Sequence, residues 1–299
     1  MTAQRKLTHH LKGDKVIAWI LVTATIIATM FPFYWMVRSS LTPAADLVTD
    51  ANRFWPSNPT LINFQRILGL TSTQQAIAAG GTGATINFAR YTINSFVYAG
   101  SIAIAQTLSS AAAAYAFARL HFKGRNILFG LVLAGLMIPG IFTLLPNFVF
   151  IRQTGLLNTM SGIIAPALLT SPFAVFFLRQ FFLSIPQSVE EAAMLDGLGT
   201  IGRFWRIVLP MSRGPISTML LITFVGMWKD YMWPMVAGRG EQTRLLTVAL
   251  SVFQQQAPNR SPDWTGLMAG ATLSVIPVII ILIIFGRMLV ESLSFSGSK

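Results

Sequence analysis

Long apolar segments alternate with shorter polar segments along most of the chain. Each apolar segment holds about twenty residues and almost no charge, which is the length that an α-helix needs to cross roughly 30 Å of hydrocarbon. Backbone groups in lipid must find their hydrogen-bond partners within the chain, so helices are the expected form. The pattern predicts an all-α, polytopic membrane protein with six transmembrane helices. The six segments are Val16–Met36, 90–119, Ile127–Ile151, Met160–Leu178, Gly214–Met235 and Trp264–Gly286.

Composition supports this prediction. Hydrophobic residues occupy 53% of the 299 positions and charged residues only 11%, with a mean hydropathy of +0.60. A soluble domain carries about 25% charged residues, so the soluble classes are excluded. The net charge of +12 is better explained by membrane topology than by nucleic acid binding, and no nucleic acid partner is expected. The absence of cysteine excludes disulfides and thiol chemistry.

The positions of lysine and arginine predict how the chain crosses the membrane. Basic residues in one set of connections mark the cytoplasmic face under the positive-inside rule. Both termini are therefore expected in the cytoplasm, with 1–15 as an N-terminal segment, 16–290 as the membrane domain and 291–299 as a tail. Residues 37–88 then form a long external connection. Within it, the small and polar Thr71–Thr85 predicts a flexible loop, either a contact for an external partner or a tolerated insertion.

The sequence offers no recognisable enzyme site. It lacks the pattern G-x-x-x-x-G-K-[ST], so the chain has no nucleotide-binding loop of that type. His9, His10 and His121 lie at predicted cytoplasmic edges and do not have metal-ligand spacing. No nucleophile and base are placed together by the sequence. We therefore expect no catalytic residue, no metal site and no cofactor in this chain.

Lys229 and Asp230 form a charged pair at the end of the fifth apolar segment. Ionisable residues at membrane depth suggest a transport route or a proton relay. The favoured alternative is a position at the outer membrane interface, where Trp228, Tyr231 and Trp233 would form part of an aromatic belt. Adjacent residues do not face each other on a helix, so the two charges are expected to have separate partners.

Prolines and small residues modify the predicted helices. Pro139, Pro146 and Pro277 each remove one helical hydrogen bond, and the resulting kinks can serve gating. The small-residue run Ser109–Ala116 allows a neighbouring helix to approach closely, which favours a packing role. Polar side chains within the spans are candidates for a substrate pathway, although helix packing explains them as readily. These candidates are Asn94, Tyr98 and Asn147.

The segment SVEEAAMLDGLGTIGRFWRIVLP, between the fourth and fifth helices, breaks the apolar pattern. Ser188 and Glu191 have the spacing of a capping box, and Glu190 lies in the first turn, where the helix dipole favours negative charge. Gly197 is placed to end this helix in the left-handed conformation. An amphipathic return stretch follows, and Pro210 is expected to break it. The pattern predicts a surface helix, a turn and a return helix, suited to a protein groove or to a lipid surface.

Seven positions of this segment reproduce the pattern E-A-A-x3-G-x9-I-x-L-P. The pattern resembles the EAA loop of permease subunits in bacterial ABC importers. The segments NSFVYAG, AAYAFARLHFKGR and WKDYMWPMVAG are similar to those of the second permease subunit of maltose-type transporters. The C-terminal GRMLVESLSFSGSK is also similar, with Ser292 at a position where that family usually has glycine.

The resemblance implies a transport subunit of an ABC importer for sugars, oligosaccharides or polyols in the bacterial inner membrane. It also implies that the loop at about 180–214 docks on a cytoplasmic ATPase dimer, which binds ATP and Mg²⁺. Further implied partners are a second homologous permease, an external solute-binding protein and membrane lipid. A permease for phosphate esters or peptides, and an ion-coupled transporter, are the alternatives. The expected coupling residues are Glu190, Glu191, Ala192, Ala193, Met194, Leu195, Asp196, Gly197, Ile207, Leu209 and Pro210.

Overall fold

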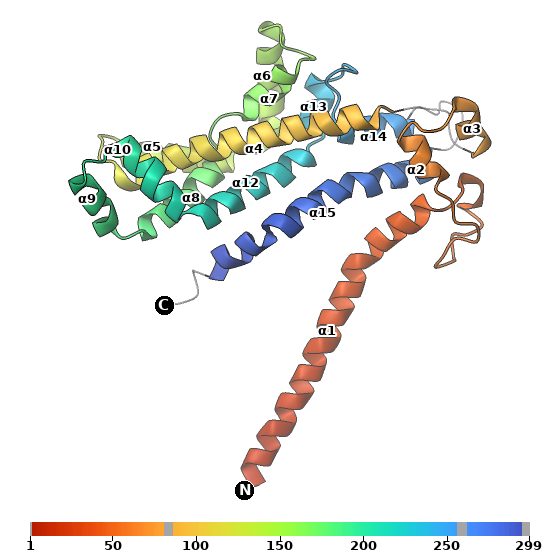
Figure 1. Ribbon diagram of the computed structural model, residues 1–299, viewed down its shortest axis with the longest axis horizontal. Helices are drawn as coiled ribbons and strands as arrows, with labels where there is room; N and C mark the ends of the chain where they lie inside the picture. Colours follow the sequence, from red (N-terminus) through yellow and green to blue (C-terminus); the bar gives the residue numbers. More distant parts are fainter. Residues whose placement is uncertain (1, 81–85, 256–261, 295–299) are drawn as a thin grey trace. The chain divides into compact units, whose positions relative to one another are not determined.

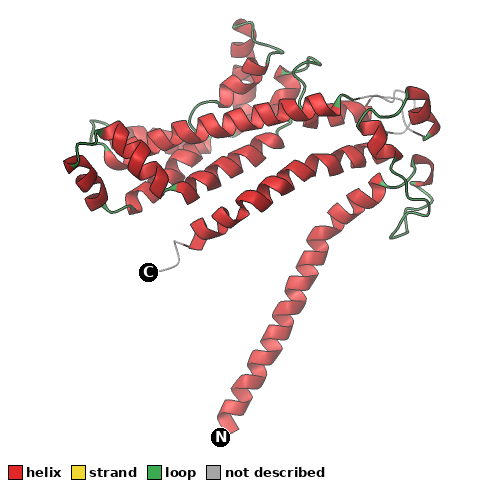
Figure 2. Cartoon of the chain, viewed as in Figure 1, coloured by secondary structure: helices red, strands yellow, loops and turns green. Residues whose placement is uncertain are grey.

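The computed structural model describes residues 2–80, 86–255 and 262–294. Every regular element in these residues is a helix, and none is a strand (Figure 2). The all-helical fold class predicted from the sequence is therefore confirmed. The chain divides into two compact units. The first unit is Met1–Asn87 with Val252–Leu273, and the second is Phe88–Ser251 with Ser274–Lys299.

The first unit contains one long helix and the connection that follows it. The long helix, α1, runs without interruption in Figure 1 although it contains Pro32. Most of its large apolar side chains between Val16 and Val37 are exposed, as expected for a surface that faces lipid or another chain. The helices of this unit are α1 (Thr2–Ser40), η1 (Ala44–Asp46), α2 (Ile62–Ile67), α3 (Thr73–Ala78) and the beginning of α15 (Trp264–Ser294).

The prediction of a flexible loop at Thr71–Thr85 is wrong for its first half. Residues Thr73–Ala78 form the short helix α3. Ser72 caps it in a reciprocal capping box: its hydroxyl accepts a hydrogen bond from the amide of Gln75, and the Gln75 side chain accepts one from the amide of Ser72. The S-x-x-Q spacing therefore specifies a helix start within a polar stretch. Residues 81–85 lie outside the described part of the chain.

The second unit is organised around α4, which packs most extensively against α8 and α12; Figure 1 shows α12 running alongside it. The helices of this unit are α4 (Phe88–Arg119), α5 (Arg125–Ala134), η2 (Gly135–Met137), α6 (Gly140–Gln153), α7 (Met160–Ile164), η3 (Ala165–Ala167), α8 (Pro172–Ser184), α9 (Gln187–Leu195), α10 (Thr200–Arg203), the π-helical turn η4 (Phe204–Val208), α11 (Leu209–Met211), α12 (Arg213–Trp228), α13 (Met232–Ala237), the beginning of α14 (Leu246–Gln255) and the part of α15 from Ser274 on.

Three helices of the described residues are long and apolar enough to cross a membrane: Lys15–Ser40 within α1, α4, and Trp264–Gly286 within α15. Three bent helix pairs raise the number of possible spans to 6. The predicted third and fourth helices are thus interrupted, and the fifth pairs with the return segment that precedes it. The bent pairs are Arg125–Met137 with Gly140–Gln153 at 99°, Met160–Ala167 with Pro172–Ser184 at 49°, and Thr200–Met211 with Arg213–Trp228 at 81°.

Proline explains two of these breaks. Ile138 precedes Pro139 and has an extended backbone, with φ −86° and ψ 111°, because the proline ring disfavours the helical conformation at the preceding residue. Pro139 then stands just before α6. Pro172 is the first residue of α8. An N–H group at this position has no acceptor within the helix, so proline costs no helical hydrogen bond there. Pro146, by contrast, lies inside α6, so it does not end the helix.

Small residues on α4 form part of the core of the second unit. Ala111 and Ala114 are fully buried and contribute to a hydrophobic cluster with Leu178 and Phe182 of α8 and with Val208 of η4. A larger side chain at either alanine would hold the neighbouring helices apart. The packing role predicted for the run Ser109–Ala116 is therefore confirmed.

Side chains of α4 also provide partners for backbone groups at the break between α7 and α8. The Gln106 amide donates to the carbonyl oxygen of Ala167 at 2.8 Å. The Ser110 hydroxyl accepts from the amide of Ser171 at 2.9 Å. Backbone groups left without partners at membrane depth are costly. The two side chains thus help α4 to support a span that is not one continuous helix.

Candidate functional site

The charged segment that breaks the apolar pattern forms the short helix α9 and a return segment. We name residues 185–212 the α9 loop. Figure 1 places α9 and α10 near the same end of the α4 bundle. Helix α9 begins at Gln187 after Pro186, and no side chain caps its first turn. The predicted capping box between Ser188 and Glu191 is therefore wrong. The reason is that the Val189 amide already donates to the Pro186 carbonyl, so Ser188 lies inside the first turn.

Helix α9 ends as the sequence predicted. Gly197 has φ +84°, the left-handed conformation that glycine adopts without strain. The amide of Leu198 donates to the carbonyl of Ala193 at 3.0 Å, and the amide of Gly197 donates to that of Met194 at 3.1 Å. This pair of hydrogen bonds is a Schellman motif, which satisfies two carbonyl groups at the helix end.

Glu190 lies on the inner face of α9 and is only 6% exposed. Its Oε1 lies 2.8 Å from Nε of Arg119, the last residue of α4. Its Oε2 accepts a hydrogen bond from the Tyr115 hydroxyl at 3.1 Å. The sequence placed Glu190 in the first turn but gave no signal for its partners, which lie about one helical turn apart on a distant helix.

Arg119 contacts a third element in addition to α9. One terminal nitrogen of its guanidinium group donates to the carbonyl of Phe182 at 2.7 Å and also to the carbonyl of Ile185. These carbonyls belong to the end of α8 and the residue that follows it. One buried cation therefore joins the ends of α4 and α8 to the start of α9.

The outer face of α9 has a different character. Leu195 is 89% exposed and Met194 is 55% exposed, and they lie beside the exposed Glu191. Two further apolar side chains of the loop, Ile201 and Trp205, are also exposed. Ile201 and Trp205 belong to the bent pair that begins at Thr200, whereas α9 lies outside all the candidate spans, and exposed apolar surface there is typical of an interaction site. Of the other predicted coupling positions, Ala192, Asp196, Gly197 and Pro210 are exposed, Ile207 is half-buried, and Ala193 and Leu209 are buried.

The return segment contributes to the core on one side. Phe204 is buried and its ring lies 5.4 Å from that of Tyr115, centroid to centroid. Pro210 does not end the segment, because it occupies the first turn of α11 just after the π-helical turn, where its missing N–H is tolerated. The chain turns instead at Ser212, whose amide donates to the carbonyls of Val208 and Leu209. The predicted break at Pro210 is therefore displaced by two residues.

Two of the three candidate pathway residues lie on α4 and hold the segment that follows α12. Tyr98 is 1% exposed, and its hydroxyl donates to Oδ2 of Asp230 at 2.7 Å. The Asn94 amide donates to the carbonyls of Gln242 and Arg244. Asn147 is half-buried on α6, a separate element. Lys229 is exposed while Asp230 faces Tyr98, so the two adjacent charges point to different surroundings.

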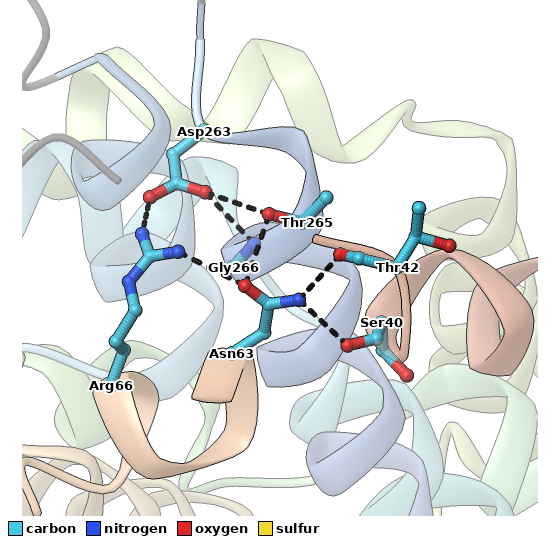
Figure 3. A network of polar contacts seen from close by, with 7 residues as sticks. All are labelled: Ser40, Thr42, Asn63, Arg66, Asp263, Thr265 and Gly266. Atoms are coloured by element: carbon cyan, nitrogen blue, oxygen red, sulfur yellow. Dashed lines mark hydrogen bonds and ion pairs between the residues drawn. The ribbon is translucent and has the colours of Figure 1, made fainter. Parts of the chain in front are cut away.

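The first unit contains a buried polar cluster, which we name the polar clamp: Asn63, Arg66, Asp263 and Thr265 (Figure 3). Arg66 forms an ion pair with Asp263 and donates to the Asn63 side chain. Asp263 caps α15 by accepting from the amide of Gly266 at 2.9 Å. Burial lowers the pKa of Arg66. The sequence gave no signal for this cluster, because Asn63 and Thr265 are 202 positions apart in the chain.

The Asn63 side chain connects the polar clamp to the end of α1. Its amide nitrogen donates to the carbonyls of Ser40 and Thr42 at 2.9 and 2.8 Å (Figure 3). Its oxygen accepts from Thr265 at 3.2 Å. The clamp therefore joins the end of α1, helix α2 and the start of α15 within the first unit, and its contacts are those of a structural element. In the described residues no three His, Cys, Asp or Glu side chains are grouped to hold a metal ion.

Long apolar helices and broken spans define a polytopic membrane protein, and α9 adds a short helix with an exposed apolar face. The family described as binding-protein-dependent transport system inner membrane component matches residues 106–294. The chain belongs to this family, and it is a permease of the ABC importer class. The fold, the transport role and the multi-pass membrane location predicted from the sequence are confirmed.

Several relatives are similar over most of their length. The arabinooligosaccharides transport system permease protein AraQ of Halalkalibacterium halodurans is 30% identical, over 96% of this chain and 99% of the relative. The sn-glycerol-3-phosphate transport system permease protein UgpE of Agrobacterium fabrum is 29% identical, over 93% and 95%. The diacetylchitobiose uptake system permease protein NgcG of Streptomyces coelicolor is 32% identical, over 70% and 69%.

A solved structure has the same fold. It is a chain of a bacterial ABC transporter involved in the import of the acidic polysaccharide alginate, with a TM-score of 0.77 and 21% identity. The similarity covers 92% of this chain and 96% of that chain. At this identity the similarity is evidence for the fold alone.

Proposed function

We propose that the chain forms half of the translocation pathway of an importer for sugars, oligosaccharides or polyols, and that it is driven through the α9 loop. The observation that carries this proposal is the exposed apolar pair Met194 and Leu195 on a helix outside the candidate spans. Glu190 anchors the inner face of that helix, so its outer face is available to a partner. A short helix that presents one face in this way suits insertion into a groove of another protein.

The proposed partner at α9 is a separate cytoplasmic ATPase dimer, which binds ATP and Mg²⁺. A second, homologous permease would complete the pathway, and an extracytoplasmic solute-binding protein would deliver the substrate. The family description, which names a binding protein, supports the last of these partners. Membrane lipid would cover the remaining apolar surface, including that of α1.

The substrate class rests on the relatives. Two of those described above are named for arabinooligosaccharides and diacetylchitobiose, which supports a saccharide. The relative named for sn-glycerol-3-phosphate supports a phosphate ester as the second candidate. Binding of a panel of both classes to the partner solute-binding protein would separate them. Saturable binding of a saccharide, but not of a phosphate ester, is the expected result.

The proposed location is the bacterial inner membrane, with both termini and the α9 loop in the cytoplasm. The distribution of lysine and arginine supports this orientation. The same distribution leaves the connection that contains α2 and α3 on the external side, where a solute-binding protein would dock.

Leu195→Arg tests the proposal at α9. Leu195 is 89% exposed, so the substitution is expected to leave folding intact while placing a charge at the centre of the interface. Loss of a central interface side chain weakens binding by about tenfold or more. We expect the ATPase to be lost on co-purification and uptake to fall with it. Leu70→Arg is the matched control for ATPase binding alone, because Leu70 is 72% exposed and belongs to the connection expected on the external side, which a cytoplasmic ATPase would not reach.

An ion-coupled transporter predicts a different result. Uptake would then continue in membranes that lack the ATPase, and it would respond to the ion gradient. Retention of the ATPase by the Leu195→Arg variant, or uptake without any ATPase, would contradict the proposal.

A further inference from the structure

The two adjacent glutamates of α9 lie on different faces of the helix. Glu191 is exposed beside the apolar pair Met194 and Leu195, whereas Glu190 is buried against α4. A side chain that is only 8% exposed is not available to a docking partner. Glu190 therefore has a different role from Glu191, although both lie in the same turn.

The Glu190 carboxylate is held at both oxygens by one helix. Arg119 and Tyr115 lie four residues apart on α4, which places them on the same face. Each contacts a different oxygen of Glu190, so the carboxylate cannot rotate away from α4 without losing a contact. The side chains of Arg119 and Glu190 are 7% and 8% exposed, so water screens their attraction little.

Arg119 makes this attachment rigid, because the same guanidinium group is bonded to the backbone that leads into α9. Its bonds to the carbonyls of Phe182 and Ile185 fix the chain on the N-terminal side of the helix. Phe204 packs on Tyr115 and fixes the return segment on the other side. Both connections of α9 and its inner face are thus tied to the C-terminal end of α4.

We propose that Arg119 is the positioning residue that makes α9 and α4 move as one body, with Glu190 as its partner. A displacement imposed on the outer face of α9 is then carried directly into a helix that is long enough to span the membrane. This inference rests on the proposed function, since it assumes that the ATPase acts at α9. It adds that Glu190 transmits the motion and does not contact the ATPase.

Glu190→Gln tests this inference in the reconstituted importer with its ATPase and its solute-binding protein. The variant keeps the size of the side chain and an acceptor for Tyr115, but it removes the charge opposite Arg119. We expect the ATPase to remain bound and to hydrolyse ATP, while uptake per ATP hydrolysed falls by roughly two- to thirty-fold, the range typical of residues that couple two sites. A residue that only stabilises the fold would lower the yield of the complex and leave this ratio unchanged.

Arg179→Gln is the matched control. Arg179 also joins α8 to α4, through a bond from its Nε to the carbonyl of Phe117 at 3.2 Å, and it is half-buried. The structure gives it no hydrogen bond to α9 among the described residues. The uptake ratio of this variant is therefore expected to match that of the wild type.

Tyr115→Phe provides a second test if Glu190→Gln does not fold. It removes one hydrogen bond to Glu190 and keeps the ring that packs on Phe204. We expect a smaller decrease in the same ratio. An unchanged ratio in both variants would overturn the inference, and so would loss of the ATPase from Glu190→Gln to the extent expected for Leu195→Arg. Failure of the wild-type chain to bind any ATPase would instead contradict the proposed function.

Discussion

At the scale of single residues, Asp50 offers a test of the first unit through pH. Its carboxylate is buried and accepts hydrogen bonds from the amide of Ser57 at 2.8 Å and from the Ser57 hydroxyl at 2.7 Å. The hydrogen bond from the Ser57 amide lowers the pKa of Asp50 most, and the one from the Ser57 hydroxyl lowers it next. The positive charges of Arg53 and Arg38 lower it by less, whereas burial raises it.

A lowered pKa gives a stability contribution with a defined sign. It is fully present above the ordinary carboxyl pKa of about 3.9 and is lost as the pH falls through the lower pKa of the folded state. We therefore expect wild type to unfold at a higher temperature than Asp50→Asn at pH 7, and the difference to shrink below about pH 4. Thermal unfolding from pH 7 to pH 2 measures it. Ser57→Ala, which keeps the amide donor, should show an intermediate difference. A difference in unfolding temperature between wild type and Asp50→Asn that does not change with pH would contradict this account.

At the scale of secondary-structure elements, two adjacent serines on α4 make hydrogen bonds that are expected to differ in their contribution to stability. Ser110 accepts from the backbone amide of Ser171 at the break before α8. Ser109 donates only to the Gln106 carbonyl of its own helix in the described contacts. Ser110→Ala leaves the Ser171 amide without its acceptor, which costs about 1–3 kcal/mol.

Ser109→Ala is the control for this prediction, and it should change the free energy of unfolding by less than about 0.5 kcal/mol. Denaturant unfolding of the purified chain in detergent measures both variants. Equal effects at the two serines would show that α4 does not support the break between α7 and α8 in this way.

The end of α9 gives a second prediction at this scale. Gly197 has φ +84°, whereas Gly199 has φ −66° and ψ 173°, and an added Cβ would meet no atom within 4 Å at either position. Gly197→Ala is therefore expected to destabilise the helix end by about 1 kcal/mol through backbone strain alone. Gly199→Ala introduces no such strain; Gly199 is the N-cap of α10, so any cost of the alanine falls on α10 and not on the end of α9.

Hydrogen exchange of the amides in residues 187–198 would measure this difference. A loss of about 1 kcal/mol corresponds to an opening equilibrium about fivefold larger in Gly197→Ala. The Gly199→Ala variant should exchange as the wild type does. Similar exchange in both variants would mean that the left-handed turn at Gly197 does not limit the stability of α9.

These elements also show how far the sequence could predict the structure. Apolar length predicted the first, second and sixth helices correctly, because burial in lipid requires it, but it did not predict that the third, fourth and fifth segments belong to bent helix pairs. Pro139 gave a signal for a kink, but the size of the bend depends on packing, as in the close approach of Gly135 to Pro172. The ion pair of Arg119 with Glu190 was not predictable, because the two residues are separated by several helices and each has ordinary local explanations. The glycine turn was predictable because its cause is local.

At the scale of the whole molecule, the predicted membrane topology can be tested by labelling single cysteines. The chain contains no cysteine, so every introduced cysteine is a unique label site. Val48 in the first unit and Glu241 in the second are exposed, and both belong to connections expected outside the cell. His121, which follows α4, is exposed and belongs to a connection expected in the cytoplasm.

We expect Val48→Cys and Glu241→Cys to react with a membrane-impermeant maleimide in spheroplasts, and His121→Cys to react only after the membrane is permeabilised. The reason is the asymmetry of basic residues, which are retained on the cytoplasmic side. The unsubstituted chain is the control for background labelling. Reaction of His121→Cys in intact spheroplasts would place the adjoining α9 loop outside the cell. An ATPase in the cytoplasm could then not reach α9, so this single measurement bears on the orientation and on the proposed coupling together.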